Sequence, residues 1–180
     1  MAIIRPLRGF TPQIGERCFV AETAAIIGDC TIGDDCSIWY SAVLRGDVNS
    51  IIIGDRVNIQ DCAVLHTLYK RSITKLGDDV SVGHNATVHG AVVGDCCLIG
   101  MGATILDNAV IEAGTIIAAG ALVLSNQHCE GNSVYAGVPA KKVKSLTPQQ
   151  VENMILKNAQ GYMMYKEWYN EDEVDESDNL

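Results

Sequence analysis

An aliphatic residue recurs every six positions along most of the chain, with small jumps in phase. A small residue usually stands four places after each of these anchors, and Gly often follows the anchor directly. One large and one small inward side chain with a Gly- or Asp-rich corner describe one flat face of a three-sided prism, and three faces make an 18-residue coil. The anchors are Val20, Ile26, Ile32, Ile38, Leu44, Ile53, Ile59, Leu65, Leu76, Val82, Val88, Val93, Ile99, Ile105, Ile111, Ile117 and Val123.

This period predicts an all-β solenoid rather than a sheet of hairpins. Ordinary antiparallel strands would alternate with period two and turn back every eight to twelve residues, which an 18-residue repeat does not do. The pattern resembles the hexapeptide repeat of the left-handed parallel β-helix family over residues 20 to 125. Coils of such a prism stack about 4.8 Å apart, as paired strands do.

The sequence changes character after the repeat. Gly137-Val138-Pro139-Ala140 resembles the turn by which members of this family leave the β-helix. Thr147-Pro148-Gln149-Gln150 predicts a helix start with Thr147 as N-cap and Gln150 closing a capping box. Val151, Ile155, Tyr162 and Tyr169 then recur on one side of that helix. We expect a β-helix domain over 1–146, a C-terminal α-helix packed along it over 147–170, and a disordered acidic tail over 171–180.

Composition and charge exclude several classes of function. Aromatic residues make up 6% of the chain and Gly contributes 17 residues, which suits a narrow core of small branched side chains. The net charge of −9 falls to about −3 without the acidic tail, so the basic surface that nucleic-acid binding requires is missing. We find no apolar run of membrane-spanning length and no export signal, and we expect a cytoplasmic protein with no membrane partner. The seven cysteines form no CxxC pair and are expected to be reduced thiols.

Three of the four histidines occupy defined positions in the repeat. His66 and His89 each directly follow an anchor on the same face, one coil apart, and Arg45 continues that column one coil earlier. His84 is the second residue after its anchor on the third face, and Asp61 occupies the equivalent position one coil before it. Neither column alone holds enough ligands for a metal ion.

The two columns together predict a metal site shared between subunits. If the first edge of one subunit meets the third face of another, the contact closes as a ring, for which a three-sided prism favours three members. Three neutral imidazoles with an open fourth position fit catalytic zinc (Zn2+), and Fe2+ or Co2+ would also accept imidazole ligands. The alternative, unrelated surface histidines, leaves the alignment of both columns unexplained. We therefore expect a homotrimer with a metal site at each subunit interface.

The same residues resemble the γ-class carbonic anhydrase family. That family's signature is similar to Arg45-Gly46-Asp47, then Asn58-Ile59-Gln60-Asp61, then His66, His84 and His89. The resemblance implies reversible hydration of CO2 to bicarbonate by a metal-bound hydroxide. It also implies that one subunit supplies His66 and His89 and its neighbour supplies His84.

Further roles are implied by the same resemblance. An Arg45–Asp47 ion pair would lie at the subunit interface, beside Asp61 in the other column. Gln60 would orient the hydroxide, with Asn58 supporting it from behind. Tyr162, on the final helix, resembles a tyrosine that approaches the site in some members, although its position also suits an apolar helix face.

Two departures from the family pattern predict low turnover. Val48 stands where well-characterised members carry a proton-accepting Glu, and the loop after His66 reads Leu68-Tyr69-Lys70-Arg71 in place of an acidic insertion. Hydration requires that a proton be carried away after water ionises. We interpret His128 as a surface residue rather than a replacement proton carrier.

Two other functions are compatible with the fold. One is a hexapeptide-repeat acyl- or acetyltransferase, or a thioesterase, acting on coenzyme A thioesters. Such transferases commonly use one catalytic His and a coenzyme A cleft rather than a three-histidine set. The other is a non-catalytic metal-binding assembly subunit, which fold-level analogy permits.

Overall fold

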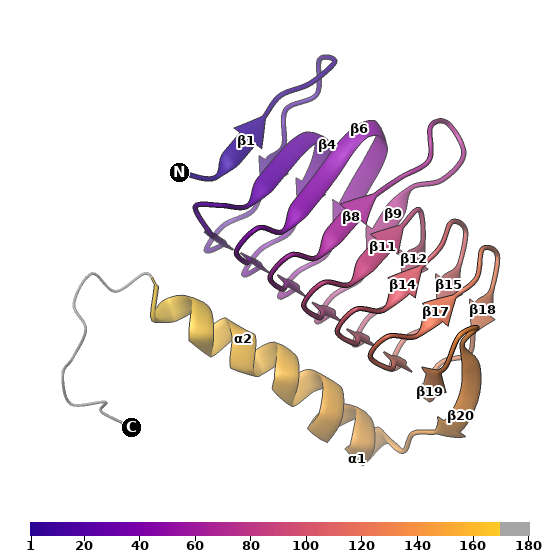
Figure 1. Ribbon diagram of the computed structural model, residues 1–180. Coiled ribbons are helices and arrows are strands. Elements are labelled where there is room, and N and C mark those ends of the chain that lie inside the picture. The colour runs from indigo at the N-terminus through magenta and orange to yellow at the C-terminus, as the bar shows by residue number, and fades with distance from the viewer. Residues whose placement is uncertain (170–180) are drawn as a thin grey trace.

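A computed structural model describes residues 1–169, and over this range the chain winds into a left-handed parallel β-helix (Figure 1). The strands of neighbouring coils pair in parallel and build two sheets. The 12-stranded sheet bends around one edge of the prism and forms two of its faces, and the 8-stranded sheet forms the third. The predicted fold class is confirmed.

The strands are short because each crosses only one face before the chain turns. The 12-stranded sheet contains β1 (Ile3–Arg5), β2 (Gln13–Ile14), β4 (Ala25–Ile32), β6 (Val43–Ile53), β8 (Val64–His66), β9 (Thr74–Leu76), β11 (Thr87–His89), β12 (Val92–Val93), β14 (Thr104–Ile105), β15 (Val110–Ile111), β17 (Leu122–Val123) and β18 (His128–Cys129). The 8-stranded sheet contains β3 (Phe19–Val20), β5 (Ser37–Ile38), β7 (Asn58–Ile59), β10 (Ser81–Val82), β13 (Leu98–Ile99), β16 (Ile116–Ile117), β19 (Ser133–Ala136) and β20 (Lys141–Ser145).

The interior of the prism is filled by the residues that the six-residue period selects. Every predicted anchor from Ile26 to Val123 is buried in one continuous core, and only Val20, on the first coil, is half-buried. The small positions between them, such as Ala63 and Cys97, are fully enclosed. Their size lets the three faces approach one another closely enough to exclude water. All seven cysteines are free thiols, as expected.

Strands of the β-helix extend on both sides of residues 20 to 125, the range over which the sequence resembles the hexapeptide repeat. Before that range, β2 pairs with β4 so that Ile14 lies beside Ile32. After it, Cys129 in β18 pairs with Ile111, and Tyr135 in β19 continues the inward column above Ile117. The chain then turns at residues 137–140, and β20 returns antiparallel to β19.

Coils with more than 18 residues place the additional residues at one edge of the prism. β6 runs continuously around this edge from one face to the next, and its pairing with β4 shifts register between Gly28 and Cys30. The loop between β8 and β9 leaves the coil at the same edge and protrudes from the prism (Figure 1). Strand register on either side of the loop is preserved, with Leu44 beside Leu65 and Ile53 beside Leu76.

A C-terminal helical segment lies along the 8-stranded sheet and runs back toward the first coil (Figure 1). It consists of α1 (Pro148–Val151), one π-helical turn (Glu152–Leu156) and α2 (Lys157–Glu167). The predicted capping box at Thr147 and Gln150 is present. Ile155 is buried against Leu146 and Ile116, which fastens the helix to the sheet. Within residues 1–169 no helix is both long and apolar enough to span a membrane. The predicted acidic tail lies outside the described residues.

Candidate metal centre

His66 and His89 end adjacent strands at the edge where the extra residues leave the coil. β8 and β11 pair in parallel with His66 directly beside His89, which is the stacking expected from the repeat. Both rings are largely buried, with 16% and 27% of their side-chain surface exposed. Nδ1 of His66 and Nε2 of His89 face each other at 3.1 Å. Two ring nitrogens on successive coils therefore converge on one point.

Each of the three histidines has one ring nitrogen in contact with a carboxylate. In His66 and His89 this is the nitrogen that does not face the other histidine. Asp47 Oδ1 lies 2.9 Å from His66 Nε2, and Asp107 Oδ1 lies 3.0 Å from His89 Nδ1. On the third face, Asp61 Oδ2 lies 2.8 Å from Nδ1 of His84. In the tautomer that donates to the carboxylate, the nitrogen on the other side of each ring is unprotonated and can bind a metal ion.

This donor set fits a tetrahedral metal ion. With the ring protons on the carboxylate side, the lone pairs of both nitrogens face each other at 3.1 Å and would both be available to a metal ion between them. Two imidazoles bound to one zinc ion at about 2.0–2.1 Å would have their nitrogens roughly 3.3 Å apart, close to the observed spacing. Carboxylates on the far nitrogens are the usual outer partners of metal-binding histidines.

One chain does not complete the site. Among residues 1–169, no group of three or more His, Cys, Asp or Glu side chains lies close enough together to hold a metal ion. His66 and His89 form the pair, while His84 extends from the corner after β10 with 39% of its side chain exposed. The chain therefore carries two candidate ligands at one position and a third candidate on another face.

Arg45 and Asp47 form an ion pair within the same chain, next to the histidine pair. Burial acts to raise the pKa of the Asp47 carboxyl, but hydrogen bonds from His66 and Arg45 outweigh it and the pKa is lowered. Asp47 therefore stays ionised and available as a proton acceptor for His66.

Asn58 and Gln60 lie on the third face, one coil before His84. Both are buried, and Gln60 Nε2 donates to Asn58 Oδ1 over 3.0 Å. Tyr162 reaches the same region from α2, with its ring against the edge of Trp39 at 5.6 Å. Burial raises the pKa of the Tyr162 hydroxyl, and the negative charge of Asp61 adds to that rise. The helix thus brings Tyr162 to the side of the prism that carries Asp61.

Asp107 was not among the predicted site residues, although it lies next to the predicted histidine column. Asp107 pairs with His89 and also accepts a 2.6 Å hydrogen bond from Ser72 Oγ in the β8–β9 loop. The Ser72 oxygen in turn accepts from Leu68 N over 3.0 Å. Counting one coil on from Val88 reaches Ile105, so Leu106 continues the histidine column and Asp107 is the next residue after it. The contacts tie the protruding loop to a candidate ligand.

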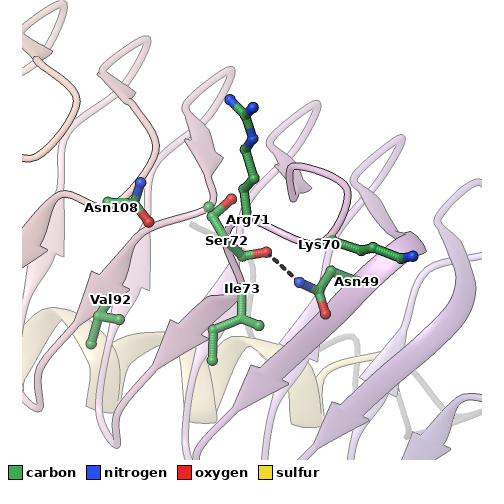
Figure 2. Close-up of a pocket in the computed structure, with 8 residues that line it drawn as sticks. Asn49, Lys70, Arg71, Ser72, Ile73, Val92 and Asn108 are labelled. Atoms are coloured by element: carbon green, nitrogen blue, oxygen red, sulfur yellow. Dashed lines mark hydrogen bonds between the residues drawn. The ribbon is translucent and has the colours of Figure 1, made fainter.

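The hollow that Val48 lines carries both signs of charge, with Arg8 beside Asp29 and Asp47. Arg8 Nη1 donates to the Asp47 carbonyl over 3.2 Å, and its guanidinium lies 5.9 Å from the centre of the Tyr69 ring. A shallow pocket of about 270 Å³ beside the loop is lined in part by Asn49, Lys70 and Arg71. Figure 2 shows Lys70 and Arg71 extending away from each other at its rim. His128, farther along the prism, is exposed and pairs with Glu112 over 2.7 Å.

Comparison with known proteins agrees with the fold and with the family resemblance. A family model described as bacterial transferase hexapeptide (six repeats) matches residues 11–46, 73–106 and 90–125. The chain is 43% identical over 152 residues to carbonic anhydrase of Geobacillus kaustophilus, covering 84% of this chain and 83% of that protein.

A plant relative and a solved structure extend the comparison. Gamma carbonic anhydrase 2, mitochondrial, of Arabidopsis thaliana is 44% identical over 147 residues, covering 78% of this chain and 52% of the plant protein. The chain therefore spans about half the length of that relative. The crystal structure of a hexapeptide transferase family protein from Anaplasma phagocytophilum superimposes with a TM-score of 0.88 at 36% identity, covering 93% of this chain and 98% of that one.

Proposed function

Because this chain belongs to the γ-class carbonic anhydrase family of hexapeptide-repeat proteins, we propose that it catalyses the reversible hydration of CO2 to bicarbonate. The main support for this proposal is that His66 Nδ1 and His89 Nε2 lie 3.1 Å apart, with a carboxylate behind each ring. A bound zinc ion at this point would lower the pKa of a coordinated water toward about 7. Iron(II) or cobalt(II) would be compatible with the same ligands.

The third ligand is His84 of a neighbouring subunit in a homotrimer. Support comes from the division of the ligands within one chain, where His84 belongs to another face of the prism. Its carboxylate partner Asp61 lies on Nδ1, which would leave Nε2 of His84 to bind the metal, as Nδ1 of His66 and Nε2 of His89 would. A contact between two different surfaces of identical subunits closes as a ring, and three-sided prisms suit a ring of three.

Gln60 orients the reacting water in this proposal. Its Nε2 already donates to Asn58, so Oε1 is the atom available to accept a hydrogen bond. An accepting oxygen held in place favours the hydroxyl orientation in which a lone pair faces CO2. Tyr162, half-buried beside Asp61, would close the same side of the site.

Turnover is expected to be low because the proton has no carboxylate to carry it away at the usual position. Val48 has no titratable group, and the nearby loop presents Lys70 and Arg71. At neutral pH these cations do not accept protons. Buffer molecules would then remove the proton, so the rate should rise with buffer concentration.

Mixed trimers test the shared site directly. A His66→Ala chain and a His84→Ala chain each lack one ligand and should bind no zinc tightly when purified alone. Refolded or co-expressed together at equal amounts, they should regain about a quarter of the sites. A site is intact only where the chain that supplies the His66–His89 edge still has His66 and the neighbouring chain still has His84. Recovery of zinc and of CO2 hydration together supports the proposal, and no recovery contradicts a shared site.

Activity and metal content separate the proposal from its alternatives. The wild-type trimer should hold about one zinc ion per chain and hydrate CO2 faster than buffer at neutral pH, with Gln60→Ala as the control variant. Zinc binding with a rate equal to buffer would favour a non-catalytic metal-binding assembly subunit. A metal-free trimer that binds coenzyme A would contradict the proposal and favour acyl transfer.

A further inference from the structure

A chain of hydrogen bonds runs from Gln60 to the C-terminal helix. Gln60 Nε2 donates to Asn58 Oδ1 over 3.0 Å, and Asn58 Nδ2 donates to Ser81 Oγ over 2.7 Å. Asn158 of α2 donates its own Nδ2 to the same Ser81 oxygen over 2.9 Å. Three side chains from the sheet and one from the helix are therefore connected by a continuous row of hydrogen bonds.

The sheet members of this chain are buried and fixed by strand register. Asn58 and Ser81 lie side by side on β7 and β10, one coil apart. Their exposed fractions are 1% and 0%, and that of Gln60 is 5%. Water therefore has little access to replace a lost hydrogen-bond partner. The side-chain amides of Asn58 and Gln60 must then form their hydrogen bonds with neighbouring protein groups.

The helix member is held by apolar contacts on the same helical face. Ile155 is fully buried three residues before Asn158, and Ala159 directly after it is 1% exposed. These contacts keep α2 against the 8-stranded sheet. Asn158 is consequently presented to Ser81 by the docking of the helix, although the two residues are 77 positions apart in the sequence.

The direction of the hydrogen bonds determines which atom of Gln60 remains available. Because Ser81 Oγ accepts from Asn58 Nδ2, the Asn58 oxygen faces Gln60 and must accept from its Nε2. Gln60 Oε1 is then left on the opposite side of the amide. If Asn58 lost its acceptor at Ser81, its amide could rotate and offer Nδ2 to Gln60, which would reverse the Gln60 amide as well.

We propose that Ser81, held from the helix side by Asn158, is a positioning residue that fixes the amide orientation of Gln60 through Asn58. The proposal rests on the function proposed above for Gln60 in CO2 hydration. It adds that docking of the C-terminal helix is part of the catalytic arrangement, although neither Ser81 nor Asn158 contacts the reacting groups.

Ser81→Ala removes the shared acceptor with a small change in volume. We expect the rate of CO2 hydration to fall roughly 10-fold, because misorientation of a positioning group is costly, while zinc content stays at the wild-type level. The discriminating readout is coupling: in a Gln60→Ala background, Ser81→Ala should cause no further loss. If the double variant hydrates CO2 more slowly than Gln60→Ala by the same factor that Ser81→Ala causes in the wild-type protein, the positioning role is overturned.

A second measurement does not depend on activity. The side-chain amide resonance of Gln60 is assigned by its disappearance in Gln60→Ala, and it should exchange slowly with water in the wild-type protein. In Ser81→Ala it should shift and exchange faster, and Asn158→Ala should change it in the same direction. An unchanged Gln60 amide in both variants would overturn the inference, even if the wild-type protein proved inactive and the proposed function failed.

Ser37→Ala is the matched control for the amide measurement. Ser37 occupies the equivalent position one coil before Asn58, is 2% exposed, and accepts from Trp39 Nε1 over 2.9 Å instead of from the Gln60 chain. It removes a buried hydroxyl from the same sheet without touching Asn58 or Gln60 through a hydrogen bond. The Gln60 amide should be unchanged, and a matching change there would mean that general loosening, not positioning, is being measured.

Discussion

Removal of the Asp107 carboxylate should weaken zinc binding without removing a ligand. Asp107 accepts from His89 Nδ1 at 3.0 Å and from Ser72 Oγ at 2.6 Å. In Asp107→Ala the His89 ring loses the contact that fixes its protonation and rotation, and Ser72 loses an acceptor. The free imidazole then populates orientations and tautomers in which Nε2 is not directed at His66.

The size of the effect follows from what such carboxylates contribute elsewhere. Loss of an outer partner of a metal-binding histidine typically costs 10- to 100-fold in metal affinity, which is about 1.4 to 2.7 kcal/mol. Zinc affinity would be measured by competition with a chromophoric chelator at neutral pH. The protein concentration must be held constant, because a site shared between subunits is linked to assembly.

The chain provides a matched control in a second histidine–carboxylate pair. His128 Nε2 lies 2.7 Å from Glu112 Oε1 on the exposed surface, away from the two ligand columns. Glu112→Ala should leave zinc affinity unchanged. Equal affinities of Asp107→Ala and the wild-type protein, or an equal loss in both variants, would refute the reasoning.

Two further predictions concern a thiol and a glycine. A hydrogen bond with the Cys36 side chain outweighs burial and lowers the pKa of the Cys18 thiol to about 7. The rate at which iodoacetamide alkylates Cys18, followed by mass spectrometry, should therefore rise through pH 7 and level off above it. A rate still rising at pH 9 would contradict the lowered pKa. Gly90→Ala would bring a methyl group against the Ser72 hydroxyl at a backbone φ of +60°, and should reduce zinc content and stability. Gly102→Ala shares the positive φ of +66° but meets nothing within 4 Å, so it should show the cost of backbone strain alone and retain zinc.

The sequence predicted the middle of the β-helix well because packing there depends on one repeated rule. Each coil must fill the same narrow interior, so Ile, Leu and Val recur at positions that can be counted. The repeat could not be followed past Val123 because Tyr135 places an aromatic ring in the inward column, where the pattern requires an aliphatic residue. β20 has no burial period at all, since each of its residues from Lys141 to Ser145 is exposed.

The helix illustrates a different limit of sequence reasoning. Its start was predictable because the capping box at Thr147 is local. Tyr169 was expected on the packed face, yet it is 52% exposed, since it lies beyond the end of α2 and contacts Phe19 and Trp39 by one side of its ring. The π-helical turn over Glu152–Leu156 has no marker in the residues that form it.

The candidate site was partly predictable for the same reason as the core. The repeat converts sequence distance into height along the prism, so the stacking of His66 on His89 and of His84 beside Asp61 could be counted. Contacts that cross between elements could not. Asn158 reaches Ser81 only because the helix folds back over the sheet, and no period in the sequence connects those two residues.

The edge that absorbs extra residues has a consequence for how this chain could change over evolution or by design. Register is preserved on both sides of the β8–β9 loop, so the length and content of that loop are separated from the packing of the interior. The loop is also tied to a candidate ligand by Ser72 and Asp107. Residues 68 to 71 can therefore change in length and charge while the interior and the candidate ligands stay as they are, so the proposed proton transfer could be altered separately from the scaffold.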